Sequence, residues 1–423
     1  MDAFTKEDLK RFQAESLDDK FQRTLAKVSE WYVRWNNEVY VSFSGGKDST
    51  VLADICAKWC ELQKIPLYLV FVNTGLEYPE IQRHVKFFAQ WLRDKYGIDV
   101  VLDILRPKMR FDEVIRECGY PLISKEVSNT IRLAKDNIRN GVYSHRVCKL
   151  GVKPEEYGGL YDSGEYDYAA SLKNSKFTQH KWRQLLDLDS DMSEECCNIM
   201  KKEPLREYFK KTGRRPIIAT MACESMNRET AWLKNGCNAF DSQEPSSRPM
   251  SFWMGQDILR YIKDAGLPIA SVYGDIVYET DPDQMRIEDY GIKGGGTEKL
   301  KTTGCDRTGC IFCAFGCHCE KGKTRFQRLK ETHPRQYEYC IGGGEYVWIG
   351  EHKHDNGTWG EFDLINENGE PMNETEIEDF MKEYQNSENI RVKKIWQPNK
   401  HGLGLGHVFD ELNKVYGEGF IKY

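Results

Sequence analysis

The feature that most constrains the fold is an apolar strand that runs through a glycine loop into a helix. We expect the strand at 38–43, followed by the loop Ser44-Gly45-Gly46-Lys47-Asp48-Ser49 and a helix to about Gln63. Apolar strands follow at 67–72 and 98–105, with a helical pattern at 78–96 between them. Strands that alternate with helices predict an α/β fold with a parallel sheet, on which ligands bind beyond the carboxyl ends of the strands.

The chain of 423 residues is long for a single domain, and its regularity changes along its length. We expect four segments: a helical N-terminal cover at 1–36, an α/β domain at 37–290 with an insertion at about 120–190, a cysteine-rich region at 291–344, and a small α+β appendage at 345–423. No apolar run approaches the roughly 18 residues of a spanning helix, and the N-terminus lacks the apolar core of a signal peptide. We therefore expect a cytoplasmic protein without a membrane partner, whose fourteen cysteines are mostly reduced.

The glycine loop has the composition of a phosphate-binding site. Two glycines let the backbone turn and approach a ligand closely, and the amides at the start of the next helix attract anions. Lys47 adds a positive charge, while Ser44, Ser49 and Thr50 supply hydroxyl groups. The spacing is neither that of the kinase-type P-loop nor that of the three-glycine dinucleotide fingerprint. The loop therefore predicts another class of nucleotide site.

Ser-Gly-Gly-Lys-Asp-Ser after a strand is similar to the pyrophosphate-binding loop (PP-loop) of the adenine nucleotide alpha hydrolases. That group includes ATP pyrophosphatases, tRNA-thiolating enzymes and phosphoadenosine phosphosulfate (PAPS) reductases. Two later stretches resemble PAPS reductase family motifs in the family's order: Asn73-Thr74-Gly75, which precedes Glu80, and Glu224-Ser225-x-x-Arg228. The resemblance covers about residues 38–340 and implies a doubly wound, mostly parallel, Rossmann-like sheet.

The same resemblance implies an adenine nucleotide, ATP or PAPS, with Mg²⁺ accompanying ATP. The residues that it implies in nucleotide binding are Ser44, Gly45, Gly46, Lys47, Asp48, Ser49, Asn73, Thr74, Gly75, Glu224, Ser225 and Arg228. We expect Lys47 and Arg228 to be catalytic, because both would stabilise charge that develops on the phosphates. Asn73 stands where the family usually has Asp, and a neutral amide supplies no charge to Mg²⁺.

Two cysteine pairs indicate a metal or cluster site. Cys196 and Cys197 are adjacent and cannot easily form a disulfide with each other, while Cys310-x-x-Cys313 bends two sulfurs toward one centre. This pattern resembles the [4Fe-4S] ligands of the iron–sulfur branch of the sulfonucleotide reductases, and zinc is the alternative. The cysteines that are near enough in sequence to replace one ligand are Cys305, Cys317, Cys319 and Cys340. The remaining cysteines, which we interpret as small buried hydrophobic residues, are Cys56, Cys60, Cys118, Cys148, Cys223 and Cys237.

Two further features bear on function. Thiol-dependent sulfonucleotide reductases carry a nucleophilic cysteine in a C-terminal Glu-Cys-Gly-x-His segment, whereas no cysteine follows Cys340 here and Glu117-Cys118-Gly119 is only a partial match. The stretch 201–215 carries seven Lys and Arg residues in a chain of net charge −6. We interpret this stretch as a solvated helix face, with a polyanion site as the alternative.

These observations support three hypotheses. The first is an iron–sulfur enzyme of the PAPS reductase family that cleaves ATP to AMP and pyrophosphate, so that an activated acceptor, such as a nucleic acid, receives sulfur from a donor. The second is a reductase of PAPS or adenosine phosphosulfate that releases sulfite, with a thioredoxin-like reductant and a thiol such as Cys118. The third is a non-catalytic nucleotide-sensing subunit.

Overall fold

The computed structural model describes residues 4–157, 159, 178–279, 299–355 and 357–423. The chain divides into two compact units, each made of two segments: unit 1 is Met1–Lys108 with Lys201–Cys310, and unit 2 is Met109–Met200 with Ile311–Tyr423. The four segments expected from the sequence are a finer division and stay a prediction. Residues 160–177 of the expected insertion and 280–298, where the cysteine-rich region was expected to begin, lie outside the described part.

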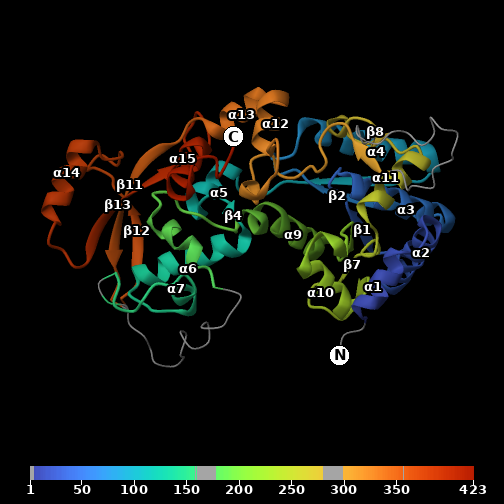
Figure 1. Ribbon diagram of the computed structural model, residues 1–423, viewed down its shortest axis with the longest axis horizontal. Coiled ribbons are helices and arrows are strands. Elements are labelled where there is room, and N and C mark those ends of the chain that lie inside the picture. The colour runs from blue at the N-terminus through green and yellow to red at the C-terminus, as the bar shows by residue number, and fades with distance from the viewer. Residues whose placement is uncertain (1–3, 158, 160–177, 280–298, 356) are drawn as a thin grey trace, which may run out of the picture. The chain divides into compact units, whose positions relative to one another are not determined.

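Unit 1 is built on a six-stranded sheet of order β3-β2-β1-β5-β7-β6 (Figure 1). The strands are β1 (Val39–Ser42), β2 (Leu67–Val72), β3 (Val100–Leu105), β5 (Arg215–Ile218), β6 (Asn238–Ala239) and β7 (Ser246–Ser247). Neighbouring strands are parallel except for β6 and β7, which are antiparallel. The predicted α/β fold with a mostly parallel sheet is therefore confirmed.

Unit 1 also contains helices and short helical turns, some of which contact the strands of this sheet. They are α1 (Lys6–Gln13), α2 (Leu17–Arg34), α3 (Lys47–Gln63), α4 (Pro79–Tyr96), α9 (Glu203–Thr212), α10 (Met226–Asn235) and α11 (Gly255–Asp264), together with the short η3 (Ala222–Glu224) and η4 (Ser271–Tyr273) and the hairpin β8 (Ile276–Tyr278) and β9 (Leu300–Thr302). Helix α3 packs against β1, β2, α2, α4 and α11, and its residues 49–57 are all buried. A helix buried on every side is a rigid support for the loop that precedes it.

A buried carboxylate fixes α3 to its neighbours. Asp54 has no exposed surface and accepts hydrogen bonds from the hydroxyl groups of Tyr96 (2.7 Å) and Tyr261 (2.8 Å) and from Lys95 Nζ (3.1 Å). The last two residues of α4 supply two of these donors, and α11 supplies the third. The contacts therefore fix the positions of α3, α4 and α11 relative to one another. A buried charge is tolerated only when it is paired in this way.

The N-terminal cover differs from its prediction in one respect. The single helical stretch expected from the sequence is two helices, α1 and α2, which are separated at residues 14–16. The cause is local, because the Ser16 side chain accepts from the amide of Asp19 (3.1 Å) and so starts a new helix.

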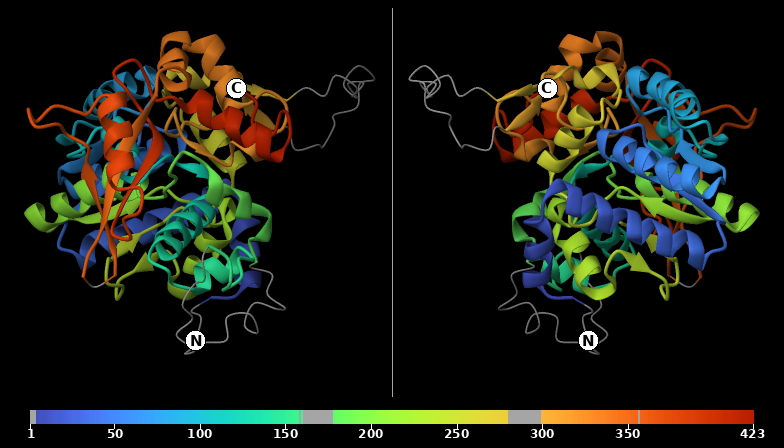
Figure 2. Two further views of the ribbon diagram at one scale, coloured as in Figure 1. Left: turned by 90° about the vertical axis from the view of Figure 1, so that its left-hand side faces the viewer. Right: turned by 90° about the vertical axis from the view of Figure 1, so that its right-hand side faces the viewer.

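Unit 2 combines helices with a three-stranded antiparallel sheet of order β12-β11-β13. Its elements are α5 (Phe111–Cys118), β4 (Leu122–Ile123), α6 (Lys125–Arg139), α7 (His145–Lys149), η1 (His180–Asp187), β10 (Ala314–Phe315), η6 (Cys317–Cys319), α12 (Arg325–Thr332), α13 (Pro334–Ile341), β11 (Glu345–Lys353), β12 (Trp359–Asp363), α14 (Glu374–Glu383), β13 (Ile390–Gln397) and α15 (Leu405–Tyr416). Figure 2 shows α14 beside the sheet, where Phe380 packs edge-on against Phe362 of β12. Residues 198–202 form a single π-helical segment, η2 (Asn198–Lys202), where the chain passes from unit 2 to unit 1. Among the described residues, no helix is both long enough and apolar enough to cross a membrane.

Candidate nucleotide-binding site

The strand order of unit 1 places a topological switch point beside β1. The chain runs from β1 outward to β2 and β3 on one side, while β5 and β7 lie on the other side. In the register of the sheet, Val41 is opposite both Leu69 of β2 and Ile217 of β5. Connections that leave neighbouring parallel strands in opposite directions open a crevice at the carboxyl ends of those strands, which is where such sheets bind ligands.

The loop after β1 needs glycine at its second position. Gly45 has φ +72°, and a Cβ there would lie 2.8 Å from Cγ2 of Val85 and 2.9 Å from Cγ2 of Ile81, both on α4. Gly46 then caps α3. The loop thus packs closely against α4. Two of its amides at the start of α3 donate to side-chain hydroxyl groups rather than to backbone carbonyl groups. Those amides are Gly46 N, which donates to Ser44 Oγ at 3.4 Å, and Lys47 N, which donates to the Tyr273 hydroxyl at 3.3 Å.

A cavity of about 570 Å³ opens in front of this loop. It is lined by Ser44, Gly46, Lys47, Asp48, Ser49, Ala219, Met221, Cys223, Glu224, Arg228, Gly255, Ile258, Tyr273, Asp306, Arg307 and Thr308. Lys47 Nζ donates to the carbonyl oxygen of Asp306 at 2.8 Å, and burial lowers the pKa of this lysine. Because Lys47 Nζ contacts a neutral carbonyl oxygen rather than a carboxylate, it can transfer this hydrogen bond to an anion in the cavity.

Carboxylates hold the other cations of the cavity in position. Glu224, after β5, forms ion pairs with both Arg228 and Arg307. Burial raises the pKa of Asp48, whereas the nearby Lys47, Arg307 and Arg228 act in the opposite direction. Burial and the like charge of Arg307 lower the pKa of Arg228. Three cationic side chains therefore surround one cavity at the start of α3, an arrangement suited to a polyphosphate.

Comparison with known proteins agrees with this geometry. Residues 16–134 match the family model described as the PP-loop domain, and residues 151–315 match the phosphoadenosine phosphosulfate reductase domain.

Residues 16–134 are therefore similar to a PP-loop domain, and this segment carries the glycine loop.

An uncharacterized protein of Methanocaldococcus jannaschii is 22% identical over 346 residues, which are 79% of this chain and 55% of that protein, so the chain spans about half the length of this curated relative. The NMN synthetase of Francisella tularensis is similar at 11% identity and a TM-score of 0.29, over 78% of this chain and 98% of that one.

Unit 1 brings together only part of the predicted nucleotide-binding set. Asn73, Thr74 and Gly75 do not line the cavity, because they form a closed turn: Gly75 N donates to Asn73 Oδ1 (3.1 Å), and the Thr74 hydroxyl donates to Glu77 Oε1 (2.7 Å). Glu77 in turn lines a smaller cavity of about 120 Å³ together with Ser44.

Ser225 and Gly45 also lie outside the set that lines the larger cavity. Ser225 caps α10, with its Oγ accepting from the amide of Arg228 at 3.4 Å, and Gly45 packs against α4. Both residues therefore position the site without lining it: Ser225 fixes the start of the helix that carries Arg228, and Gly45 lets the loop pack closely on α4.

The structure adds lining residues that were not predicted. Tyr273 and Thr308 share a hydrogen bond of 2.5 Å between their hydroxyl groups, and Arg307 reaches Glu224. Arg307 and Thr308 lie inside the stretch that we interpreted only through its cysteines, whereas Tyr273 belongs to no motif. Cys223 is a correction: it is exposed and lines the cavity, although we predicted a buried hydrophobic residue. It follows the last sheet-forming residues of β5 on the short η3 turn, where the chain leaves the core.

The predicted cluster ligands are distributed over both units. Cys196, Cys197 and Cys313 belong to unit 2, whereas Cys310 is the last residue of unit 1. Four thiols are a donor set that suits [4Fe-4S] or zinc. Among the described residues, however, no three His, Cys, Asp or Glu side chains are grouped so as to hold a metal ion. The cluster therefore stays a prediction.

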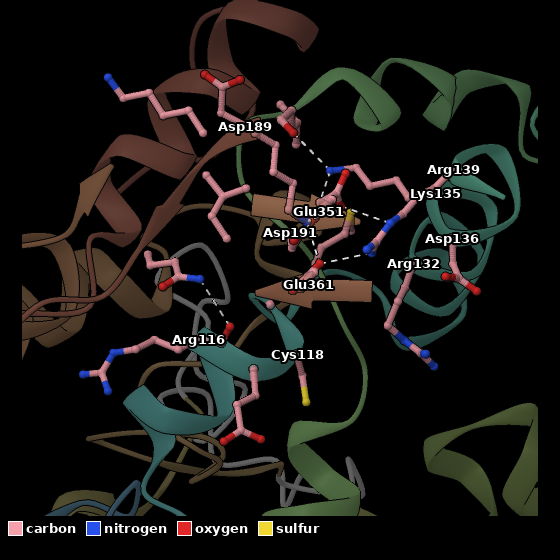
Figure 3. A pocket seen from close by; sticks show the side chains of 18 of the residues that line it. Arg116, Cys118, Arg132, Lys135, Asp136, Arg139, Asp189, Asp191, Glu351 and Glu361 are labelled. Carbon is pink, nitrogen blue, oxygen red and sulfur yellow. Dashed lines mark hydrogen bonds and ion pairs between the residues drawn. The ribbon is translucent and has the colours of Figure 1, made fainter. Parts of the chain in front are cut away.

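Unit 2 contains a separate cavity of about 640 Å³ between α6, residues 186–195 and one face of the three-stranded sheet (Figure 3). In Figure 3, Lys135 and Arg139 point toward the acidic side chains at its centre. Glu351 pairs with Arg139 (3.0 Å), and Lys135 pairs with Asp191 (3.3 Å). The charges at the centre of this cavity are thus compensated within the unit.

Cys118 lies at the edge of the same cavity and is half-buried. Burial and the adjacent Glu117 raise the pKa of its thiol. A thiol with a raised pKa is largely protonated near neutral pH and is therefore a poor nucleophile.

Proposed function

We propose that the PP-loop domain binds ATP in the 570 Å³ cavity and cleaves it between the α- and β-phosphates, which transfers AMP to an acceptor and releases pyrophosphate. The observation that carries this proposal is the convergence of two connections at the switch point: the one after β1 leads to Lys47 at the start of α3, and the one after β5 leads to Arg228 in the first turn of α10. The volume lies within the range of about 300–1,000 Å³ typical of small-molecule sites.

In this proposal the β- and γ-phosphates occupy the start of α3. The amides of Gly46 and Lys47 exchange their long contacts to hydroxyl groups for contacts to phosphate oxygens. Lys47 Nζ leaves the carbonyl of Asp306 and neutralises charge on the departing pyrophosphate, while Arg228 positions the phosphate nearest β5. Both effects are electrostatic, and they stabilise the transition state because the groups are already positioned.

Mg²⁺ is expected to accompany ATP, and the chemistry of the lining residues fits it. Mg²⁺ is usually held by one or two carboxylates and by phosphate oxygens, and Asp48 lines the cavity at the start of α3. When bound, the ion would neutralise phosphate charge.

The acceptor is proposed to receive sulfur after it is activated. This step follows from the resemblance to sulfur-transferring relatives of the PP-loop enzymes, with a nucleic acid as acceptor and an external sulfur donor. Cys196, Cys197, Cys310 and Cys313 are the proposed ligands of a [4Fe-4S] cluster, with zinc as the alternative. Iron and sulfide analysis after anaerobic purification tests the cluster: about four irons per chain are expected for one such cluster.

The match of residues 151–315 to the PAPS reductase domain favours a second candidate, a sulfonucleotide reductase that releases sulfite. The raised pKa of Cys118 weighs against this cysteine as the attacking thiol. Sulfite release from labelled PAPS in the presence of thioredoxin would support this candidate in place of ATP cleavage.

The proposed function is tested by pyrophosphate release with ATP in a matched pair of variants. Lys47→Ala removes a cation that lines the cavity, whereas Lys86→Ala removes an exposed lysine of α4. We expect Lys47→Ala to reduce the rate by about a hundredfold or more, and Lys86→Ala to retain the rate of the wild type. Equal rates for Lys47→Ala and the wild type would overturn the proposal.

A further inference from the structure

The stretch 201–215 is the most basic part of unit 1, and it folds mainly into α9. It contains seven Lys and Arg residues and only two carboxylates, Glu203 and Glu207, in a chain whose net charge is −6. From the sequence we favoured a solvated helix face over a polyanion site. Three observations in the structure favour the polyanion site.

The first observation is that the cations form a stripe. Lys202 immediately precedes α9 and has a helical backbone, and Arg206 and Lys210 follow at intervals of four residues, so the three lie on one face. All three are exposed, whereas Pro204 and Tyr208 are buried on the opposite side. Successive members of the stripe are about 6 Å apart along the helix axis.

The second observation is that the neighbouring acidic residue Glu207 is already neutralised. It forms an ion pair with Lys108, which lies just beyond the end of β3. The Tyr208 hydroxyl donates to Asp103 of β3 at 2.8 Å and fixes the helix along that strand. Lys202 and Lys210 form no ion pair with any residue that the structure describes. Arg206 pairs with Glu244 at 2.9 Å, but both side chains are well exposed, so a stronger anion can displace this contact.

The third observation is that the stripe leads to the nucleotide site. Lys201, in η2, and Leu205, in the first turn of α9, line the smaller cavity together with Ser44 of the PP-loop. The apolar face of α9 packs on the sheet, where Tyr208 and Leu205 contact Tyr40 and Val70. A long ligand that follows the stripe toward the first residues of α9 therefore arrives beside the loop.

We propose that the stripe Lys202, Arg206 and Lys210 binds the phosphate backbone of a nucleic acid and guides it to the PP-loop. The inference rests on the proposed function, because it assigns the surface that binds the nucleic-acid acceptor of that reaction. An evenly spaced row of cations matches a ligand whose charges repeat evenly along a chain, which a nucleic acid provides and an acidic protein patch does not.

The test is the binding of short fluorescein-labelled oligonucleotides to the full chain, followed by fluorescence anisotropy between about 50 and 200 mM salt. Single-stranded RNA, single-stranded DNA and duplex DNA are compared. The variant Lys202→Gln, Arg206→Gln, Lys210→Gln is expected to bind about tenfold or more weakly at 0.1 M salt than the wild type. For a duplex, the slope of log K against log salt should become shallower by up to about 2.7, because each phosphate contact contributes about 0.9.

A control variant removes three positive charges from other helices of unit 1. Lys10→Gln, Lys86→Gln, Lys234→Gln changes exposed lysines of α1, α4 and α10, and it should bind the oligonucleotide like the wild type. Equal affinity of the stripe variant and the control would overturn the inference. So would poly-glutamate that displaces the oligonucleotide as efficiently as unlabelled nucleic acid at equal charge concentration, because the surface would then recognise charge alone.

Pyrophosphate release separates this inference from the proposed function. The stripe does not line the 570 Å³ cavity, so the stripe variant should bind ATP like the wild type, which also verifies that it is folded. If oligonucleotide binding depends on the stripe but the wild type does not cleave ATP, the nucleic-acid surface is supported and the proposed ATP cleavage is overturned. If the wild type cleaves ATP but the stripe variant binds the oligonucleotide like the wild type, the proposed function is supported and the nucleic-acid surface is overturned.

Discussion

Replacing Gly45 by Ala should damage both the stability of unit 1 and its affinity for ATP. The residue has φ +72°, and an L-residue in this left-handed region costs about 1–2 kcal/mol. The added Cβ would also lie 2.8 and 2.9 Å from methyl groups of Val85 and Ile81, and such crowding in a packed region costs about 1–3 kcal/mol. We therefore expect Gly45→Ala to lower the free energy of unfolding of unit 1 by about 2–5 kcal/mol in total.

A matched control separates the two contributions. Gly97 follows α4 with φ +63°, and a Cβ there would have no atom within 4 Å, so Gly97→Ala carries only the backbone cost. Urea denaturation of both variants should differ by the crowding contribution of about 1–3 kcal/mol. ATP affinity, measured by calorimetry, should fall in Gly45→Ala alone, because relief of the crowding moves the loop away from α4. Equal stability and equal ATP affinity in the two variants would refute the close packing of the loop on α4.

Three further variants test separate parts of the structure. Arg228→Ala should lower kcat/KM for pyrophosphate release by about 10- to 100-fold, since a hydrogen bond to a charged group contributes about 1.5–3 kcal/mol, and an unchanged value would exclude Arg228 from phosphate binding. Burial lowers the pKa of His84 to about 4, so below about pH 6.5 the unfolded chain takes up a proton that the folded chain does not. The free energy of unfolding should therefore fall by up to about 3 kcal/mol as the pH drops from about 6.5 to 4, and His84→Gln should lose this part of the pH dependence. If the urea midpoint changes with pH equally in the wild type and in His84→Gln, the histidine is not buried and neutral. Cys118→Ser should cleave ATP like the wild type, whereas loss of PAPS-dependent sulfite release in this variant would support the reductase in place of the ATP pyrophosphatase.

The central part of the fold was predictable because its signals are local. The strands β1, β2 and β3 consist mainly of apolar residues, and helices of ordinary length separate them. The two-residue strands β4, β6, β7 and β10 carry no such signal, since two residues show no periodicity, and they form only where the tertiary structure brings partners together. The break between α1 and α2 was readable in principle from Ser16 followed three residues later by Asp19.

The candidate site was predictable to the extent that it is made of contiguous sequence. The loop Ser44–Ser49 contains its own glycines, hydroxyl groups and cation, so its chemistry is visible without a fold. Tyr273 and Thr308 reach the site only because β8, β9 and the segment after them fold back toward α3, and no spacing in the sequence reports that. Asn73 and Thr74 do not line the larger cavity: Asn73 Oδ1 accepts from the amide of Gly75, and the Thr74 hydroxyl donates to Glu77, so their part in nucleotide binding stays a prediction.

The most direct test of the proposed reaction is the identity of the products formed from ATP. Chromatography of ATP labelled in the α-phosphate and, in a parallel sample, in the γ-phosphate, after incubation with anaerobically purified protein, Mg²⁺ and candidate nucleic acids, distinguishes the two ways of cleaving the triphosphate. Cleavage at the α-phosphorus predicts pyrophosphate together with AMP, either free or attached to the acceptor, and loss of both in Lys47→Ala. Formation of ADP and inorganic phosphate would contradict the assignment, because the loop at the start of α3 would then hold the phosphates for transfer of the γ-phosphate instead.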